Sequence, residues 1–109
     1  MEPHKIYLQD YLPEDVTALH TRTWGIVLKN ATAINTHEKN HEYINIVIPG
    51  HITLVSTVFL EEFFVNIIIK LHDKQPKLTD RFKLVSENNY DFNIYLKEAV
   101  NRVWAKEFA

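Results

Sequence analysis

The chain has 109 residues, a formal net charge of −2 and 46% hydrophobic residues, which is the composition of one globular domain with a core of its own. Its charged residues are mixed in sign and its apolar stretches are interrupted, so neither the basic stripe of a nucleic-acid binder nor a membrane span of roughly 20 residues is predicted. The chain has no cysteine, which removes disulfides and thiolate metal sites and favours the cytoplasm, so we expect one cytoplasmic domain over residues 1–109.

The first third of the chain predicts a strand, a loop and a helix. Residues 5–9 alternate between apolar and polar side chains, as in a short strand, and the acidic segment 10–15 reads as a loop. In residues 21–36 the apolar side chains recur at helical spacing, with Thr21 or Thr23 as the N-terminal cap. A glycine inside this helix, at position 25, costs about 1 kcal/mol relative to alanine.

The middle of the chain predicts a buried strand followed by a long helix. Residues 43–48 are rich in isoleucine and valine, which suits a strand covered on both faces, and a Pro-Gly pair ends it. Residues 56–71 contain many strand-forming side chains, but Glu62, Asn66 and Lys70 fall four residues apart. Such spacing makes one narrow polar stripe on a helix, and we therefore predict a helix that is buried over the rest of its surface.

The last third predicts a loop over residues 72–80, a strand over 81–85 and a helix that Asp91 caps. The resulting order is β-α-β-α-β-α, which indicates a single small α/β domain. Its sheet should be mostly parallel or mixed, with helices packed on it through crossover connections. Because three strands make little sheet, we also expect extra strand pairing near residues 51–54 or a homodimer across a sheet edge.

One motif resembles a metal site. His37, Glu38 and His41 fit the H-E-x-x-H pattern of zinc hydrolases, in which the glutamate acts on zinc-bound water. The surrounding residues 35–42 are polar, they lie where a helix should end, and no third ligand follows; His4 has no evident partner either. We therefore interpret the motif as a solvated connection and predict no catalytic residue and no cofactor. A weak metal site at His37 and His41, or a zinc-dependent hydrolase, is the alternative.

Ser56 and Thr57 stand where the long helix needs an N-terminal cap. Capping alone would explain them, and the functional alternative is phosphorylation or anion binding at the start of the helix. His51, in the preceding loop, is interpreted as a hydrogen-bonding loop residue. Glu61 and Glu62 are adjacent and must point in different directions on a helix, so the sequence does not support hydrolysis by paired carboxylates.

Three segments together carry a family resemblance. KIYLQDYL resembles the opening strand and turn of the STAS-like domain family of unknown function, and TRTWGIVLKNATAI resembles its first helix. INIVIPGHITLVSTVFLEEFF resembles its central signature, a strand, a short loop and a helix that begins with a small hydroxyl residue. That family is similar to the sulfate-transporter and anti-sigma-factor-antagonist (STAS) domains. The resemblance implies a STAS-like fold over most of the chain.

The resemblance also implies a function. In anti-sigma antagonists a partner kinase of the GHKL ATPase type phosphorylates a serine before this helix, and Ser56 or Thr57 occupies the matching place, although Val55 stands where the antagonist motif has an acid. We therefore expect a regulatory protein–protein interaction module that is not an enzyme, and whose protein partner is such an ATPase. The alternative is a structural protein that self-assembles through a sheet edge or the apolar helix. The residues expected to bind the partner or to accept phosphate are His51, Val55, Ser56, Thr57, Val58 and Phe59.

Overall fold

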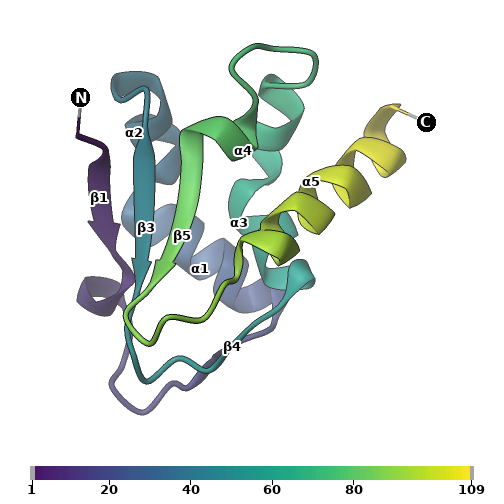
Figure 1. Ribbon diagram of the computed structural model, residues 1–109. Coiled ribbons are helices and arrows are strands. Elements are labelled where there is room, and N and C mark those ends of the chain that lie inside the picture. Colours follow the sequence, from purple (N-terminus) through teal and green to yellow (C-terminus); the bar gives the residue numbers. More distant parts are fainter. Residues whose placement is uncertain (1, 109) are drawn as a thin grey trace.

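Three parallel strands form the main sheet of the computed structural model, which describes residues 2–108 (Figure 1). The strands are β1 (His4–Tyr7), β3 (Ile44–Ile48) and β5 (Phe82–Ser86), and they lie side by side in the order β1-β3-β5. In this register Ile6, Ile46 and Leu84 form one buried row across the sheet. The predicted α/β class with a mostly parallel sheet is confirmed.

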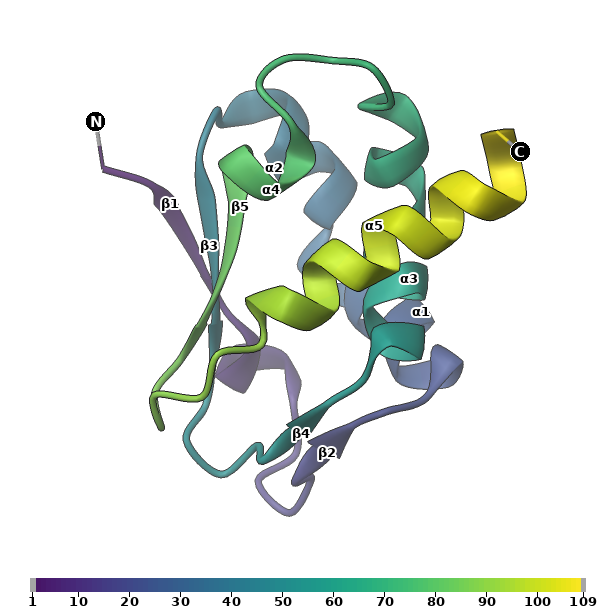
Figure 2. The same cartoon turned by 45° about the vertical axis from the view of Figure 1, so that its right-hand side comes forward.

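All of the longer helices lie on one side of this sheet (Figure 2). They are α1 (Arg22–Thr32) and α2 (Ile34–Asn40) between β1 and β3, α3 (Thr57–Lys70) between β3 and β5, and α5 (Asn93–Phe108) after β5. The opposite face carries the exposed side chains of Tyr7, Lys83 and Val85. The expectation that residues 43–48 form a strand covered on both faces holds for most of β3, in which four of the five residues are buried, although the longer helices all lie on one side of the sheet.

Helix α3 forms the centre of the molecule, packed between α1 and α5 (Figure 2). Its phenylalanines and two of its isoleucines are buried, which confirms that residues 57–70 are helical and apolar over a wide arc. The approach of α1 explains why its first turn contains a glycine. A Cβ atom at Gly25 would lie 2.8 Å from the carbonyl oxygen of Phe59 and 2.6 Å from Cβ of Glu62. None of the helices within residues 2–108 has the length and apolar character needed to cross a membrane.

The helix predicted over residues 21–36 is two helices, with the break at Ala33. Thr21 caps α1 by accepting a hydrogen bond from the Trp24 amide at 3.1 Å. At the other end Ala33 adopts a left-handed conformation with φ of 53° and donates its N–H to the carbonyl of Asn30. This conformation ends a helix and redirects the chain, and the new direction buries Ile34 completely.

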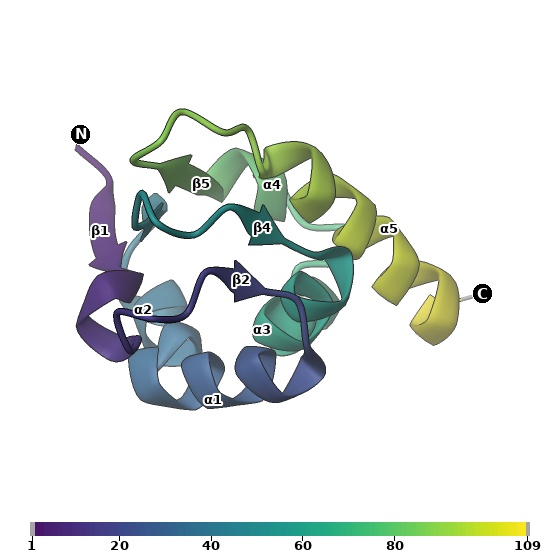
Figure 3. The same cartoon turned by 90° about the horizontal axis from the view of Figure 1, so that it is seen from below.

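The strand predicted over residues 5–9 ends at Tyr7, and short helices occupy residues 8–9 and parts of the segments predicted to be loops. A 3-10 helix, η1 (Leu8–Tyr11), follows β1, and α4 (Leu78–Arg81) immediately precedes β5. The extra pairing expected near residues 51–54 exists, but it does not extend the main sheet. Instead β4 (Leu54–Val55) pairs with β2 (Ala18–Leu19) as a separate parallel sheet, which leads directly into α3 (Figure 3).

The polar stripe of α3 connects helices. Each of its three side chains reaches a polar partner on α1 or α2, so the stripe joins these helices across their shared boundary. The predicted helix is right, but its stripe does not simply face water. The pairs are Glu62 with Arg22 at 3.2 Å, Asn66 with Asn35 at 3.4 Å, and Lys70 with Glu38 at 2.7 Å.

Candidate functional site

The start of α3 lies at the carboxyl end of the parallel strands, where open α/β sheets commonly bind ligands (Figures 1 and 3). Ser56 is the N-terminal cap of the helix. Its backbone is extended, with φ of −96° and ψ of 159°, and its hydroxyl accepts a hydrogen bond from the amide of Phe59 at 3.2 Å. Its own amide donates to the carbonyl of Leu19 in β2 at 2.9 Å. The capping role predicted for Ser56 is thus present, and β2 fixes the position of the cap.

The apolar side chains around this cap differ in exposure. Val55 and Phe59 are 1% and 2% exposed and belong to the core. The expectation that they form part of an apolar contact surface is wrong, because a partner cannot reach them. Val58 is half-buried, while Leu54 is 49% exposed. Sequence reasoning missed Leu54, because alternation along a two-residue strand gives too little pattern to say which side chain faces outward.

The polar residues of the predicted site remain accessible. His51 is exposed in the loop before β4, and Ser56 and Thr57 are half-buried. No acidic residue lies in the first turn of α3, so the partial positive charge of the helix start is not neutralised from within the helix. Along the segment that leads into α3, His51 and Leu54 are thus exposed and Ser56, Thr57 and Val58 are half-buried. We call these five residues the α3-start surface.

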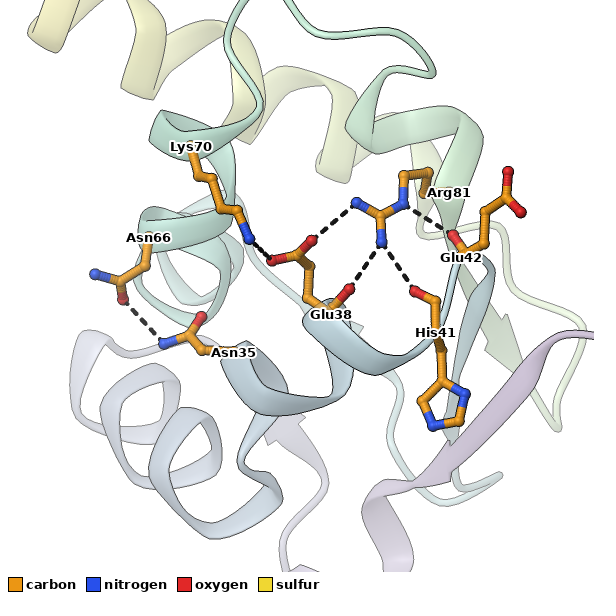
Figure 4. A network of polar contacts seen from close by, with 7 residues as sticks. All are labelled: Asn35, Glu38, His41, Glu42, Asn66, Lys70 and Arg81. Carbon is orange, nitrogen blue, oxygen red and sulfur yellow. Dashed lines mark hydrogen bonds and ion pairs between the residues drawn. The ribbon is translucent and has the colours of Figure 1, made fainter.

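The H-E-x-x-H motif does not form a solvated connection, and that interpretation is wrong. His37 and Glu38 lie within α2, and His41 is its C-terminal cap in an extended conformation. Glu38 is only 6% exposed. Its carboxylate accepts hydrogen bonds from Lys70 at 2.7 Å and from Arg81 at 3.0 Å (Figure 4).

These contacts determine the charge of Glu38. Burial raises the pKa of its carboxyl group, but the hydrogen bonds and positive charges of Lys70 and Arg81 outweigh burial, so the pKa lies below its ordinary value. A zinc hydrolase of the H-E-x-x-H type needs a glutamate that is free to take a proton from metal-bound water. In Figure 4 the carboxylate faces Lys70 and Arg81, whereas the ring of His41 points away from it. The arrangement therefore gives no support to the hydrolase mechanism.

A cavity of 670 Å³ lies beside this ion-pair network. Its lining includes Glu38, Lys70, Lys74 and Arg81. The guanidinium of Arg81 is already held by hydrogen bonds to the carboxylate of Glu38 and to three main-chain carbonyls. Glu38, Lys70 and Arg81 are thus engaged in joining α2, α3 and α4, and they serve the architecture.

The structure adds a third histidine to the two of the motif. His4, at the start of β1, stacks on His41 with ring centroids 3.8 Å apart and on His37 with centroids 4.8 Å apart. Within residues 2–108 these three histidines form a group that could hold a metal ion, because their ligand atoms all lie within 4.8 Å of one another. No sequence pattern pointed to a partner for His4, since more than 30 residues separate it from the motif.

Comparison of the chain with protein-family models, with curated proteins and with solved structures finds no match.

Proposed function

We propose that this chain is a regulatory protein–protein interaction module that binds its partner through the α3-start surface. The observation that carries the proposal is the exposed apolar side chain of Leu54 beside the hydroxyl groups of Ser56 and Thr57. An apolar contact residue adjacent to modifiable hydroxyls combines affinity with a means of changing it. The resemblance to STAS-like domains supports the same surface and extends the proposal to a partner ATPase of the GHKL type.

Phosphorylation at this surface would act by local electrostatics. A phosphate on Ser56 or Thr57 would add negative charge where the amides and dipole of α3 favour it, so the folded domain would tolerate it. The same phosphate beside Leu54 would place a strongly hydrated group within an apolar contact. We expect the partner to distinguish the two forms.

The test begins with recovery of partners from the native cell on the immobilised chain, followed by titration of each purified candidate. Leu54→Asp should weaken binding, and Ser56→Glu with Thr57→Glu should change it while circular dichroism stays unaltered. Ile94→Asp is the matched control, because Ile94 is a 60% exposed apolar residue on α5 and is not one of the five residues of the α3-start surface. Two results would contradict the assignment of the surface: Ile94→Asp weakens partner binding as much as Leu54→Asp does, or neither substitution changes it.

A second candidate function, self-assembly, is favoured by the uncovered face of the main sheet. Tyr7, Val47 and Val85 form one row across that face, and Tyr7 and Val85 are 44% and 41% exposed. A second copy of the chain could cover this row. The adjacent row on the same face contains Lys5 and Lys83, whose charges would lie beside the contact and not within it. Pairing through α3 is wrong, since α1 and α5 already cover that helix.

Sedimentation velocity over a range of concentrations distinguishes the two functions. Self-assembly predicts a concentration-dependent dimer that Val85→Lys abolishes and Leu54→Asp leaves intact. A chain that stays monomeric throughout would remove self-assembly and leave partner binding at the α3-start surface as the function to pursue.

A further inference from the structure

Three imidazole rings gather where the main sheet begins. They come from the first residue of β1, the middle of α2 and the residue that ends α2: His4, His37 and His41. All three side chains are partly exposed. Their ring centroids lie 3.8 to 6.0 Å apart, and one nitrogen from each ring can be chosen so that all three lie within 4.8 Å of one another.

The backbone holds these residues in place. The His4 amide donates to the carbonyl of Tyr43 at 2.8 Å, which fixes the start of β1 beside β3. The His41 amide donates to the carbonyl of His37 at 3.0 Å, and Arg81 donates to the carbonyl of His41 at 2.9 Å. The cluster therefore stands on hydrogen-bonded backbone, and its rings can rotate without moving the fold.

The chemical state of the rings suits coordination of a metal. Within residues 2–108, no hydrogen bond occupies a nitrogen of these three imidazoles, so their lone pairs are available. A neutral imidazole nitrogen with a free lone pair is the group that binds metals.

We propose that His4, His37 and His41 form a binding site for one divalent transition-metal ion of the zinc type, with a fourth coordination position open to solvent. Zinc binds imidazole nitrogen at about 2.0–2.1 Å and accepts four tetrahedral ligands, so the nitrogens must approach one another somewhat. Rotation of the partly exposed rings from their stacked positions provides that approach. A donor set made only of imidazole suits zinc, copper or nickel and not magnesium or calcium, which prefer oxygen.

The site is separate from the α3-start surface and from Glu38. In Figures 1 and 2 α2 lies at one end of the sheet and β4, which leads into α3, lies at the other. Glu38 is held by Lys70 and Arg81 and is not a ligand. The bound ion would tie the first strand to α2, and it does so whether or not the chain binds a partner at α3.

The test is a titration of the chelator-treated chain, prepared without a polyhistidine tag, with zinc chloride in a calorimeter and with cobalt chloride in a spectrophotometer. We expect one ion per chain and the visible absorption of tetrahedral cobalt. Loss of second-shell groups around metals weakens affinity by about 10–100-fold, so loss of a ligand in His4→Gln, His37→Gln or His41→Gln should weaken it by roughly tenfold or more. His20→Gln and His51→Gln, at exposed positions outside the cluster, should bind as the unaltered chain does.

A measurement on the unaltered protein covers the case in which a variant fails to fold. Zinc should shift the imidazole resonances of three of the six histidines in a long-range proton–nitrogen spectrum, and these should be His4, His37 and His41. No binding at one equivalent, shifts confined to other histidines, or a folded His4→Gln variant that binds as tightly as the unaltered chain would overturn the proposal.

Discussion

The guanidinium of Arg81 makes two hydrogen bonds to Glu38, donating to its carboxylate at 3.0 Å and to its main-chain carbonyl at 2.9 Å (Figure 4). It also donates to the carbonyls of His41 and Glu42. The last carbonyls of a helix have no partner within the helix, and Arg81 supplies donors at that end of α2. One side chain from α4 thus compensates a buried charge and completes the end of a helix that is 40 residues distant in sequence.

Replacement of Arg81 should therefore be strongly destabilising. Arg81→Gln leaves the carboxylate of Glu38 with Lys70 alone, and removal of one partner from a buried pair typically costs about 3–5 kcal/mol. Since the Arg81 side chain is 11% exposed and Lys70 remains, we expect about 3 kcal/mol less free energy of unfolding in urea. Arg22→Gln is the control, because the pair of Arg22 with Glu62 is exposed and is worth about 1 kcal/mol or less. Equal losses would contradict the role given to Arg81.

The sequence predicted the elements that depend on short-range pattern. The strands at residues 44–48 and 82–86, the long helix and its polar stripe follow from periodicity within one segment. The break at Ala33 does not follow from periodicity, because alanine is a strong helix former and its left-handed conformation has no signal in the local sequence. The role of Gly25 was also missed, since it depends on contact with a helix more than 30 residues away.

In the candidate sites, too, the features set by local sequence were predicted and those set by distant contacts were missed. The cap at Ser56 is local and was predicted, whereas the burial of Val55 and Phe59 depends on packing of β4 and α3 against the rest of the core. The third histidine depends on the pairing of β1 with β3, which places His4 beside Ile44 and thus near the end of α2. Pairing between distant strands carries no signal in a single sequence.

Gly25 provides a test of the packing between α1 and α3. In an isolated helix Gly25→Ala would be stabilising by about 1 kcal/mol. Here the added methyl group would meet the main-chain carbonyl of Phe59, which cannot turn aside, and overpacking of this kind costs about 1–3 kcal/mol. We expect a lower melting temperature for Gly25→Ala and little change for Thr23→Ala, an exposed position on the same helix. A more stable Gly25→Ala variant would show that the helices are not in close contact.

The effects on stability of replacing Lys106 and Arg102, two cations of α5, should be coupled, because both side chains contact Glu61. Its side chain is 4% exposed, and it lies 3.1 Å from Lys106 and 3.4 Å from Arg102. Each single variant leaves one cation beside the carboxylate, so we expect Lys106→Gln and Arg102→Gln each to have a smaller effect than loss of both cations. The double variant leaves the charge unpaired, and we expect it to lose about 1–3 kcal/mol more than the sum of the single losses. A second double-mutant cycle, of Lys106 with the exposed Lys97, should be additive; additivity in both cycles would argue against a shared role.

Ser56 should be separable into a structural and a regulatory role. Ser56→Ala removes the acceptor of the Phe59 amide and should lower the free energy of unfolding by about 1 kcal/mol. Ser56→Asp keeps an oxygen acceptor at the cap and adds a charge that the helix dipole favours, so its stability should match that of the unaltered chain. Thr57→Ala should change stability by no more than about 0.5 kcal/mol, since within residues 2–108 no hydrogen bond involves the Thr57 hydroxyl.

Because Ser56→Asp retains the cap, any change in its partner binding reports on charge at the α3-start surface and not on the integrity of the helix. Equal destabilisation by Ser56→Ala and Ser56→Asp would show that aspartate does not replace the serine cap, and would remove this separation.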